Sequence, residues 1–418
     1  MRRSPATATL FVLAVVGAAC SSGSSSSDTA AASTAVTPTA SPTSTAAPAT
    51  TISPADAAKA YIEPGPYPVG VTTLALANGT KVEVWYPAVA GTAGRETYDV
   101  RDFTPAAIKA LLTADVPATF TYDAGRDADV ADGRFPIVAF SHGAIGFRVQ
   151  STFLTAHLAG WGMVVVSADH PSRDLPHLLD LLNVSSRPAD TSVGELTGAL
   201  DLIINEGTTS GSRFFGRIDA TKVATIGHSA GGVTAFRAAA DPRVLGYVSM
   251  ASGVVGFRGN SSAPSTSAAP TTTTTTTDPV FPSKPSFFIA GDADNVLPVD
   301  EVTRPSFEKA PAPSLLWVIN GAGHLAFSDV CTFGNGRGII GVAEASGLGS
   351  FLASAPFIIK LGSDGCNPPA IPVATTFPII DHAVTAWLRN LFGIDAAPVG
   401  LDGTVANAFA TPVVIDTK

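Results

Sequence analysis

The chain has 418 residues, of which 45% are hydrophobic and 14% are charged, so it is long enough for one large or two ordinary domains. Its 39 glycines and 32 prolines beside this apolar content indicate a globular core joined to polar low-complexity stretches, which excludes a wholly disordered chain. The formal net charge is −9 at pH 7 without a basic stripe in the sequence, which excludes nucleic acid as a partner.

Residues 1–20 predict an export signal rather than a folded element. Arg2 and Arg3 give a positive start, and a short apolar run leads to small residues directly before Cys20. The run is too short to span a membrane. Small residues before a cysteine resemble the lipobox of bacterial lipoproteins, which implies a lipidated Cys20 and a protein anchored to the outer face of the cell membrane, or an extracellular one. Ordinary signal cleavage that leaves Cys20 as a free thiol is the alternative.

Residues 21–55 are almost entirely Ser, Thr, Ala and Pro, and this composition predicts a disordered tether. We expect the catalytic domain to span residues 56–418. A Thr-rich insertion at residues 259–280 interrupts it with a run of consecutive threonines, which a packed core cannot hold, so a disordered surface excursion is predicted. Whether the insertion is a working lid or a neutral excursion stays open.

The domain opens with two β-rich runs, Val69–Ala77 and Thr80–Tyr86, which Asn78-Gly79 separates as in a hairpin. The stretch 87–134 is irregular by pattern, with one helical piece at residues 105–112. Short apolar strands then alternate with helical stretches. The expected strands span 136–140, 162–168, 222–227, 244–251, 286–290 and 315–319, and the expected helices span 150–159, 191–205, 231–240 and 379–392.

This alternation predicts an α/β protein with a mostly parallel central sheet and helices on both faces. The opening hairpin adds antiparallel strands at one edge of the sheet.

The segment Gly227-His-Ser-Ala-Gly231 matches the nucleophile elbow G-x-S-x-G between an expected strand and an expected helix. The chain must turn sharply there, and glycines two positions from Ser229 avoid a collision of side chains with the turn. The turn also places Ser229 at a helix N-terminus, which favours developing negative charge. We therefore expect Ser229 to be the catalytic nucleophile.

A serine hydroxyl is a poor nucleophile until a base, here a histidine, takes its proton. In sites built on a nucleophile elbow, the acidic residue and then the histidine follow the serine along the chain. His324 lies in a loop directly after an expected strand, where a catalytic histidine belongs. His382 lies inside the last helix, where a surface position is expected. For the acid we favour Asp294 over Asp292, to which we assign hydrogen bonding within the turn.

An oxyanion hole requires two N–H groups aimed at the carbonyl oxygen of the substrate. The amide of Ala230, directly after the nucleophile, is expected to be one donor. The amide of Ala144, in the loop after the strand at 136–140, is expected to be the other.

Cys331 and Cys366 are the cysteines that remain after Cys20. Two cysteines in an exported protein most simply form a disulfide, although two buried free thiols are the alternative. His170 and His177 stand apart from other ligand types, so no metal and no cofactor are expected.

Eight segments spread along the chain form a shared pattern: Val84–Pro87, Phe140–Gly143, His157–Ala159, Asp169–Pro171, Gly227–Gly232, Asp294–Pro298, Gly323-His324 and Phe327–Cys331. Together they resemble the platelet-activating-factor-acetylhydrolase-like branch of the α/β-hydrolases, close to the bacterial cutinases and polyester hydrolases. The resemblance implies the α/β-hydrolase fold, a triad of Ser229, Asp294 and His324, and oxyanion donors at Ala144 and Ala230.

We therefore expect a serine carboxylic-ester hydrolase that acts on lipid-like or short-to-medium acyl esters through an acyl-enzyme. A monomer is expected, with the N-terminal lipid anchor as its contact with the membrane. An acyltransferase with the same triad and a non-catalytic surface binding protein on a hydrolase scaffold stay as alternatives.

Overall fold

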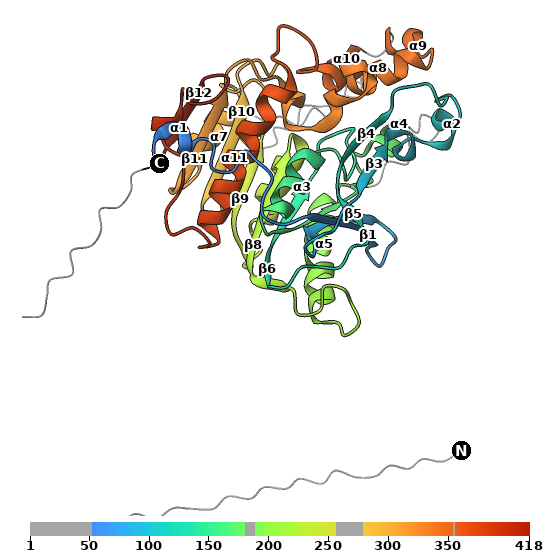
Figure 1. Cartoon of the computed structure of the whole chain (residues 1–418). Helices are drawn as coiled ribbons and strands as arrows, with labels where there is room; N and C mark the ends of the chain where they lie inside the picture. Colours follow the sequence, from blue (N-terminus) through green and yellow to red (C-terminus); the bar gives the residue numbers. More distant parts are fainter. Residues whose placement is uncertain (1–51, 180–188, 256–278, 354–355) are drawn as a thin grey trace, which may run out of the picture. The chain divides into compact units, whose positions relative to one another are not determined.

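The computed structural model describes residues 52–179, 189–255, 279–353 and 356–418, which Figure 1 draws in colour. Cys20, the expected tether as far as residue 51, and the expected insertion from residue 259 to residue 278 lie outside the described residues. The described part begins with a short helix, α1 (Pro54–Ala57), which Ser53 caps by accepting a hydrogen bond from the Asp56 amide.

A ten-stranded sheet runs through the described part in the order β12-β11-β10-β9-β8-β6-β7-β2-β1-β5. The neighbouring strands β7, β6, β8, β9, β10 and β11 are parallel to one another. By contrast, β2 pairs antiparallel with both β1 and β7, and β12 pairs antiparallel with β11. The strands are β1 (Val69–Ala75), β2 (Lys81–Pro87), β5 (Gly125–Arg126), β6 (Phe135–Ser141), β7 (Val164–Ala168), β8 (Ile218–His228), β9 (Val244–Met250), β10 (Ser286–Gly291), β11 (Ser314–Ile319) and β12 (Val413–Thr417).

The central strands are buried on both faces because helices cover both sides of the sheet. Along β6, Ile137 and Ala139 join one apolar core while Val138 and Phe140 join the other, as the two-residue period of a strand requires. One core packs under α3 (Thr152–Gly160) and α11 (Val373–Leu391), and the other packs under α5 (Ser192–Thr208), α6 (Ala230–Ala238) and α7 (Thr303–Lys309).

The remaining elements lie around the carboxyl ends of the strands or at the edges. They are β3 (Arg95–Asp99) and β4 (Thr119–Asp123), which form a two-stranded sheet, and the helices α2 (Ala106–Lys109), α4 (Leu175–Leu179), α8 (Gly338–Ala345), α9 (Gly349–Ala353) and α10 (Pro356–Ser363). Short 3₁₀ turns span Val100–Phe103, His324–Phe327, Asp329–Thr332, Gly334–Gly336 and Gly403–Val405.

The strand order reverses between β6 and β8. The chain passes from β6 to its neighbour β7 on one side and then returns to β8 on the other side of β6. The loops after these two strands diverge at such a switch point, and open α/β sheets bind their ligands in the crevice that this leaves. The fold therefore predicts a ligand-binding crevice between the loops that follow Ser141 and His228.

The expected α/β architecture is confirmed, and the expected strands and helices are found, although α11 begins six residues before the expected start at residue 379 because Pro378 lies inside it, and α2 is shorter than the helical piece expected at residues 105–112. The stretch 87–134 is less irregular than expected, because β3 and β4 pair within it. Both strands are short and rich in polar residues, with the sequences RETYD and TFTYD, so they lack the apolar alternation that marks a buried strand. The strand β12 was also not expected.

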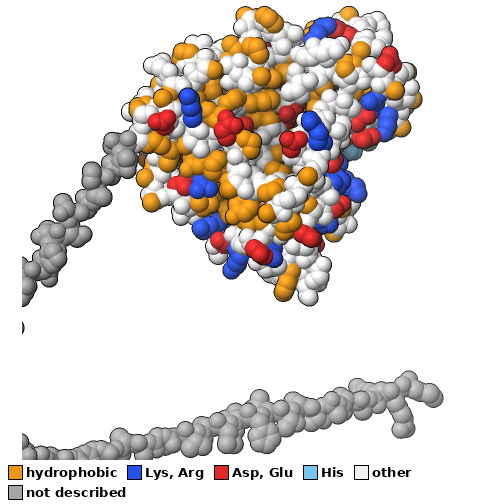
Figure 2. Space-filling model, viewed as in Figure 1, with side chains coloured by type: hydrophobic (Ala, Val, Ile, Leu, Met, Phe, Trp, Pro, Cys, Tyr) orange, Lys and Arg blue, Asp and Glu red, His pale blue; other side chains and the backbone are white. Residues whose placement is uncertain are grey.

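The surface seen in Figure 2 mixes acidic, basic and apolar side chains, and no basic stripe crosses this face. Among the helices of the described residues, none combines the length and apolar character needed to cross a membrane.

Candidate active site

Ser229 lies in a sharp turn between β8 and α6, with a backbone φ of 56° and ψ of −124°. A left-handed φ at a non-glycine residue is strained and persists only where the surroundings enforce it. A Cβ on Gly227 would lie 2.0 Å from the Gly231 carbonyl oxygen, and a Cβ on Gly231 would lie 1.9 Å from the Ser141 carbonyl oxygen. Glycine is therefore required on both sides of Ser229 for the turn to close.

The expected histidine and acid meet at this serine. His324 Nε2 lies 2.9 Å from Ser229 Oγ, and His324 Nδ1 lies 2.8 Å from Asp294 Oδ2. The side chains of His324 and Asp294 are 1% and 0% exposed, so the pair is shielded from water. With Nδ1–H donating to the carboxylate, Nε2 is left free to accept the hydroxyl proton of Ser229.

The structure separates Asp294 from Asp292 by their contacts. The second oxygen of Asp294 accepts hydrogen bonds of 2.8 Å from the amides of Val296 and Leu297, which fix the carboxylate in its loop. Asp292 instead accepts a hydrogen bond of 2.6 Å from the Gly321 amide and ties two loops together.

His382 stands apart from this site and is not the surface residue that we expected from its place in the last helix. It is fully buried on α11, where Nε2 lies 3.0 Å from the Gly400 carbonyl oxygen and donates to it. The α11 face that carries His382 packs on the sheet, so the helical position alone was a poor guide to exposure.

The loop after β6 brings Ala144 to the same small cavity as Ser229 and His324. The amides next to Ala144 already have protein acceptors: Gly143 donates to Gln150 Oε1 at 3.1 Å and Ile145 donates to the Arg173 carbonyl at 2.8 Å. Ala230 is the first residue of α6, where a helix leaves its amide without an intrahelical acceptor. The two expected oxyanion donors thus lie on the two loops that flank the switch point.

Gln150 joins the parts of this site and was missed by the sequence reasoning. Its Nε2 donates to His228 Nδ1 at 2.7 Å, while its Oε1 holds the Gly143 amide. His228 Nε2–H in turn donates to the His324 carbonyl at 2.9 Å, and burial lowers the pKa of His228 to about 3, which keeps the ring neutral. No motif identifies Gln150, because its partners are distant in the sequence.

Asp364 was missed for the same reason. Its Oδ1 accepts a hydrogen bond of 2.8 Å from the His324 amide, and its Oδ2 accepts one of 3.3 Å from the Asn295 amide. One carboxylate therefore holds the loop of the histidine against the loop of Asp294.

Cys331 and Cys366 form a disulfide, as expected, at a sequence separation of 35. The helices α8, α9 and α10 lie between these cysteines and are called the cap below; Figure 1 shows them grouped together. Cap residues Ile339 and Leu361 line the cavity at Ser229, which is only 6% exposed. The cavity measures about 10 Å³, too small for an ester group, so the cap covers Ser229.

A second, larger cavity of about 250 Å³ lies between the cap and the helices α2 and α4, and we call it the groove. Ile339 is a wall of both the groove and the cavity at Ser229. Apart from Thr104 the groove is lined by apolar residues, among them Ile108, Leu175, Leu179, Ala343, Leu348 and Ile358.

Within the described ranges, no group of three or more His, Cys, Asp or Glu side chains is arranged to hold a metal ion. Neither a protein-family model nor any curated protein matches the sequence. Among solved structures, a ferulic acid esterase from Streptomyces cinnamoneus is similar, with a TM-score of 0.54 and 17% identity over 85% of this chain and 98% of that one. Together with the sheet order and the strand–turn–helix at Ser229, this likeness shows that the chain has the α/β-hydrolase fold.

Proposed function

We propose that this chain is a serine carboxylic-ester hydrolase that works through an acyl-enzyme. The observation that carries the proposal is the continuous hydrogen-bonded series from Ser229 Oγ through His324 to Asp294, with bonds of 2.9 and 2.8 Å, on a strained elbow. The similar solved structure is that of a ferulic acid esterase, which supports ester chemistry on this fold.

In the first half of the reaction, His324 Nε2 takes the proton of Ser229 as Oγ attacks the ester carbonyl carbon. The carbonyl oxygen becomes an oxyanion, which the amides of Ala144 and Ala230 stabilise. Collapse of this intermediate breaks the bond to the alcohol, which leaves with the proton from His324.

In the second half, His324 Nε2 takes a proton from water, and the hydroxide attacks the acyl carbon of the acyl-enzyme. Ser229 then leaves and regains its proton, which releases a carboxylic acid. Asp294 accepts from His324 Nδ1–H throughout, so it fixes the ring orientation and stabilises the imidazolium in each half.

We also propose that the acyl part of the substrate is aliphatic. The groove supports this, because its wall is apolar, it shares Ile339 with the cavity at Ser229, and it offers no charged group to a polar substrate. Burial of each methylene in such a site contributes about 0.8 kcal/mol. Lipid-like or medium-chain acyl esters fit these properties.

The proposed setting is the outer face of the cell membrane, with the lipid on Cys20 as the anchor and residues 21–55 as the tether. The disulfide between Cys331 and Cys366 supports an oxidising compartment. Kinship with the platelet-activating-factor-acetylhydrolase-like branch is supported by the sequence segments at Val84–Pro87 and Phe140–Gly143.

The test is covalent labelling by a fluorophosphonate together with turnover of nitrophenyl esters, on protein made soluble by Cys20→Ser. We expect both to disappear in Ser229→Ala, with kcat lower by at least about 10⁴-fold. Ser286→Ala, which removes a buried hydroxyl elsewhere on the sheet, is the matched control and should keep both. Labelling and turnover that survive in Ser229→Ala would refute the proposal, and ester products that form only with an added alcohol would indicate an acyltransferase.

A further inference from the structure

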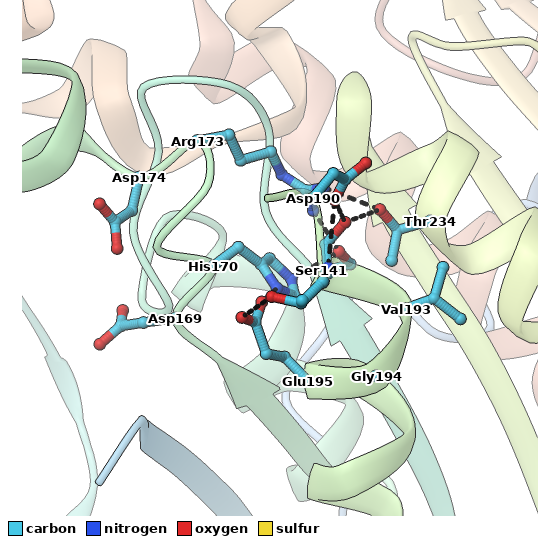
Figure 3. Close-up of polar contacts among 12 residues, drawn as sticks. Ser141, Asp169, His170, Arg173, Asp174, Asp190, Val193, Gly194, Glu195 and Thr234 are labelled. Atoms are coloured by element: carbon cyan, nitrogen blue, oxygen red, sulfur yellow. Dashed lines mark hydrogen bonds and ion pairs between the residues drawn. The ribbon is translucent and has the colours of Figure 1, made fainter. Parts of the chain in front are cut away.

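A second array of a serine, a histidine and a carboxylate lies next to the loop at residues 142–145, which follows β6, carries Ala144 and is called the oxyanion loop below. Ser141 Oγ lies 2.8 Å from His170 Nε2, and His170 Nδ1 lies 2.7 Å from Glu195 Oε2, as Figure 3 shows. The order of groups is that of the series at Ser229. Ser141 and His170 are 0% exposed, and Glu195 is 6% exposed, so no ester reaches this serine.

Arg173 distinguishes this array from a reactive one. Its Nη2 donates to Ser141 Oγ at 2.7 Å, which leaves the Ser141 hydroxyl proton to point at the histidine. The same guanidinium donates to the His142 carbonyl at 3.0 Å and, through Nη1, to Thr234 Oγ1 on α6 at 2.8 Å. Its own carbonyl accepts the Ile145 amide at 2.8 Å. Arg173 therefore contacts both ends of the oxyanion loop and the helix that follows the nucleophile.

The charges around Arg173 are consistent with a fixed arrangement. Burial lowers the pKa of His170 well below its usual range, so this ring is neutral. Its Nδ1–H donates to Glu195, and its Nε2 accepts a hydrogen bond from the Ser141 hydroxyl. Burial also lowers the pKa of Arg173 to about 10, which leaves it charged at neutral pH, and Asp190 and Glu195 favour that charge. Glu195 is held by a further hydrogen bond of 2.8 Å from Thr191 Oγ1.

We propose that Arg173, oriented by Ser141, His170 and Glu195, is a positioning residue that fixes the Ala144 amide of the oxyanion hole. The inference rests on the proposed function, because it assigns a task within that reaction. Ala144 lies between His142 and Ile145, both of which Arg173 holds, and Ala230 begins the helix that Arg173 contacts at Thr234. The two donors are therefore tied together through one residue, by its guanidinium at His142 and Thr234 and by its main-chain carbonyl at Ile145, before the substrate arrives, as stabilisation of a developing oxyanion requires.

The test compares an ester with its thionoester, in which sulfur replaces the carbonyl oxygen that the oxyanion hole receives. In Arg173→Met we expect kcat for the oxygen ester to fall about 10- to 100-fold, below the 10²- to 10³-fold cost of losing a donor, with KM changed by no more than about two-fold. Thionoester turnover should fall much less, so the ratio of the two rates should shrink. Arg389→Met is the matched control, because Arg389 is a partly buried arginine that pairs with Asp395 away from this loop.

Two milder variants keep the test decisive if Arg173→Met does not fold. Ser141→Ala removes only the hydroxyl that orients Arg173, and Thr234→Val removes the acceptor on α6, so each should lower the rate ratio in part. Arg173→Lys keeps the charge but not the planar set of donors, and it should restore only part of the ratio. An unchanged ratio in folded variants overturns the positioning role alone. A wild-type protein that hydrolyses neither ester refutes the proposed function, and the positioning role with it.

Discussion

The groove leads to a quantitative prediction about acyl chain length. Its volume is about 250 Å³, and at about 30 Å³ for a water-sized group it holds about eight methylene groups. Each buried methylene contributes about 0.8 kcal/mol, so kcat/KM should rise by up to about four-fold for each added carbon. The rise should end once the chain fills the groove, at about eight to ten carbons.

The perturbation is Ala343→Trp, which places an indole in the groove from one turn of α8. The lost volume should shorten the accepted chain, so we expect kcat/KM for the octanoate to fall by at least about ten-fold relative to that for the acetate. Ala345→Trp is the matched control, because Ala345 lies on the same helix but is exposed and does not line the groove.

The assay is the initial rate with nitrophenyl esters from acetate to palmitate, each below its critical micelle concentration. Equal effects of the two tryptophan variants would place the acyl chain somewhere other than the groove. A rate that does not depend on chain length in the wild-type protein would refute the use of the groove altogether.

Three further outcomes are expected. The double variant Cys331→Ser/Cys366→Ser should lower the free energy of unfolding by roughly 4 kcal/mol, as expected for a loop with a sequence separation of 35, and chemical denaturation measures this loss. The same variant should have a lower kcat in ester turnover, and an unchanged kcat would show that the bridge does not support the site. Asp364→Ala should lower kcat by about ten-fold, because it removes the carboxylate that binds the amides of His324 and Asn295 and so joins the two loops. A turnover equal to that of the wild type would contradict this. Burial raises the pKa of Asp329 to about 7, so the protonated form stabilises the folded state at low pH, and this contribution should be lost as the pH rises from about 4 to 7. Thermal unfolding across this range should show a smaller loss in Asp329→Asn than in the wild type, because burial also raises the pKa of Asp381, whose contribution the variant keeps; parallel curves would argue against the shift at Asp329.

The meeting of Ser229, Asp294 and His324 could be predicted because each follows a strand that is recognisable locally. The elbow motif reports a backbone geometry that few residues tolerate, and parallel strands bring the loops at their carboxyl ends to one edge. The order of these residues along the chain then selected the histidine. The catalytic roles themselves stay predictions until the variants are measured.

The supporting residues could not be predicted from local patterns. Gln150 and His228 are 78 positions apart, and the guanidinium of Arg173 reaches a residue 61 positions away on α6. Asp364 follows the cap, 40 positions after the histidine whose amide it accepts. Such contacts depend on how the loops pack, and no periodicity or motif in the sequence records them. The cap helices also escaped prediction because they pack on other loops and not on the sheet.

The bridge between Cys331 and Cys366 makes the cap a closed module within the chain. Its entry and exit are joined covalently, so the chain before and after it stays linked whatever the length of α8, α9 and α10, provided that Asp364 keeps its hydrogen bond to the His324 amide. Evolution or an engineer can thus exchange α8, α9 and α10 as a cassette, which changes what the protein admits to Ser229 while the reacting groups keep their places. Under the proposed function, specificity and chemistry are in this way encoded in separable parts of one domain.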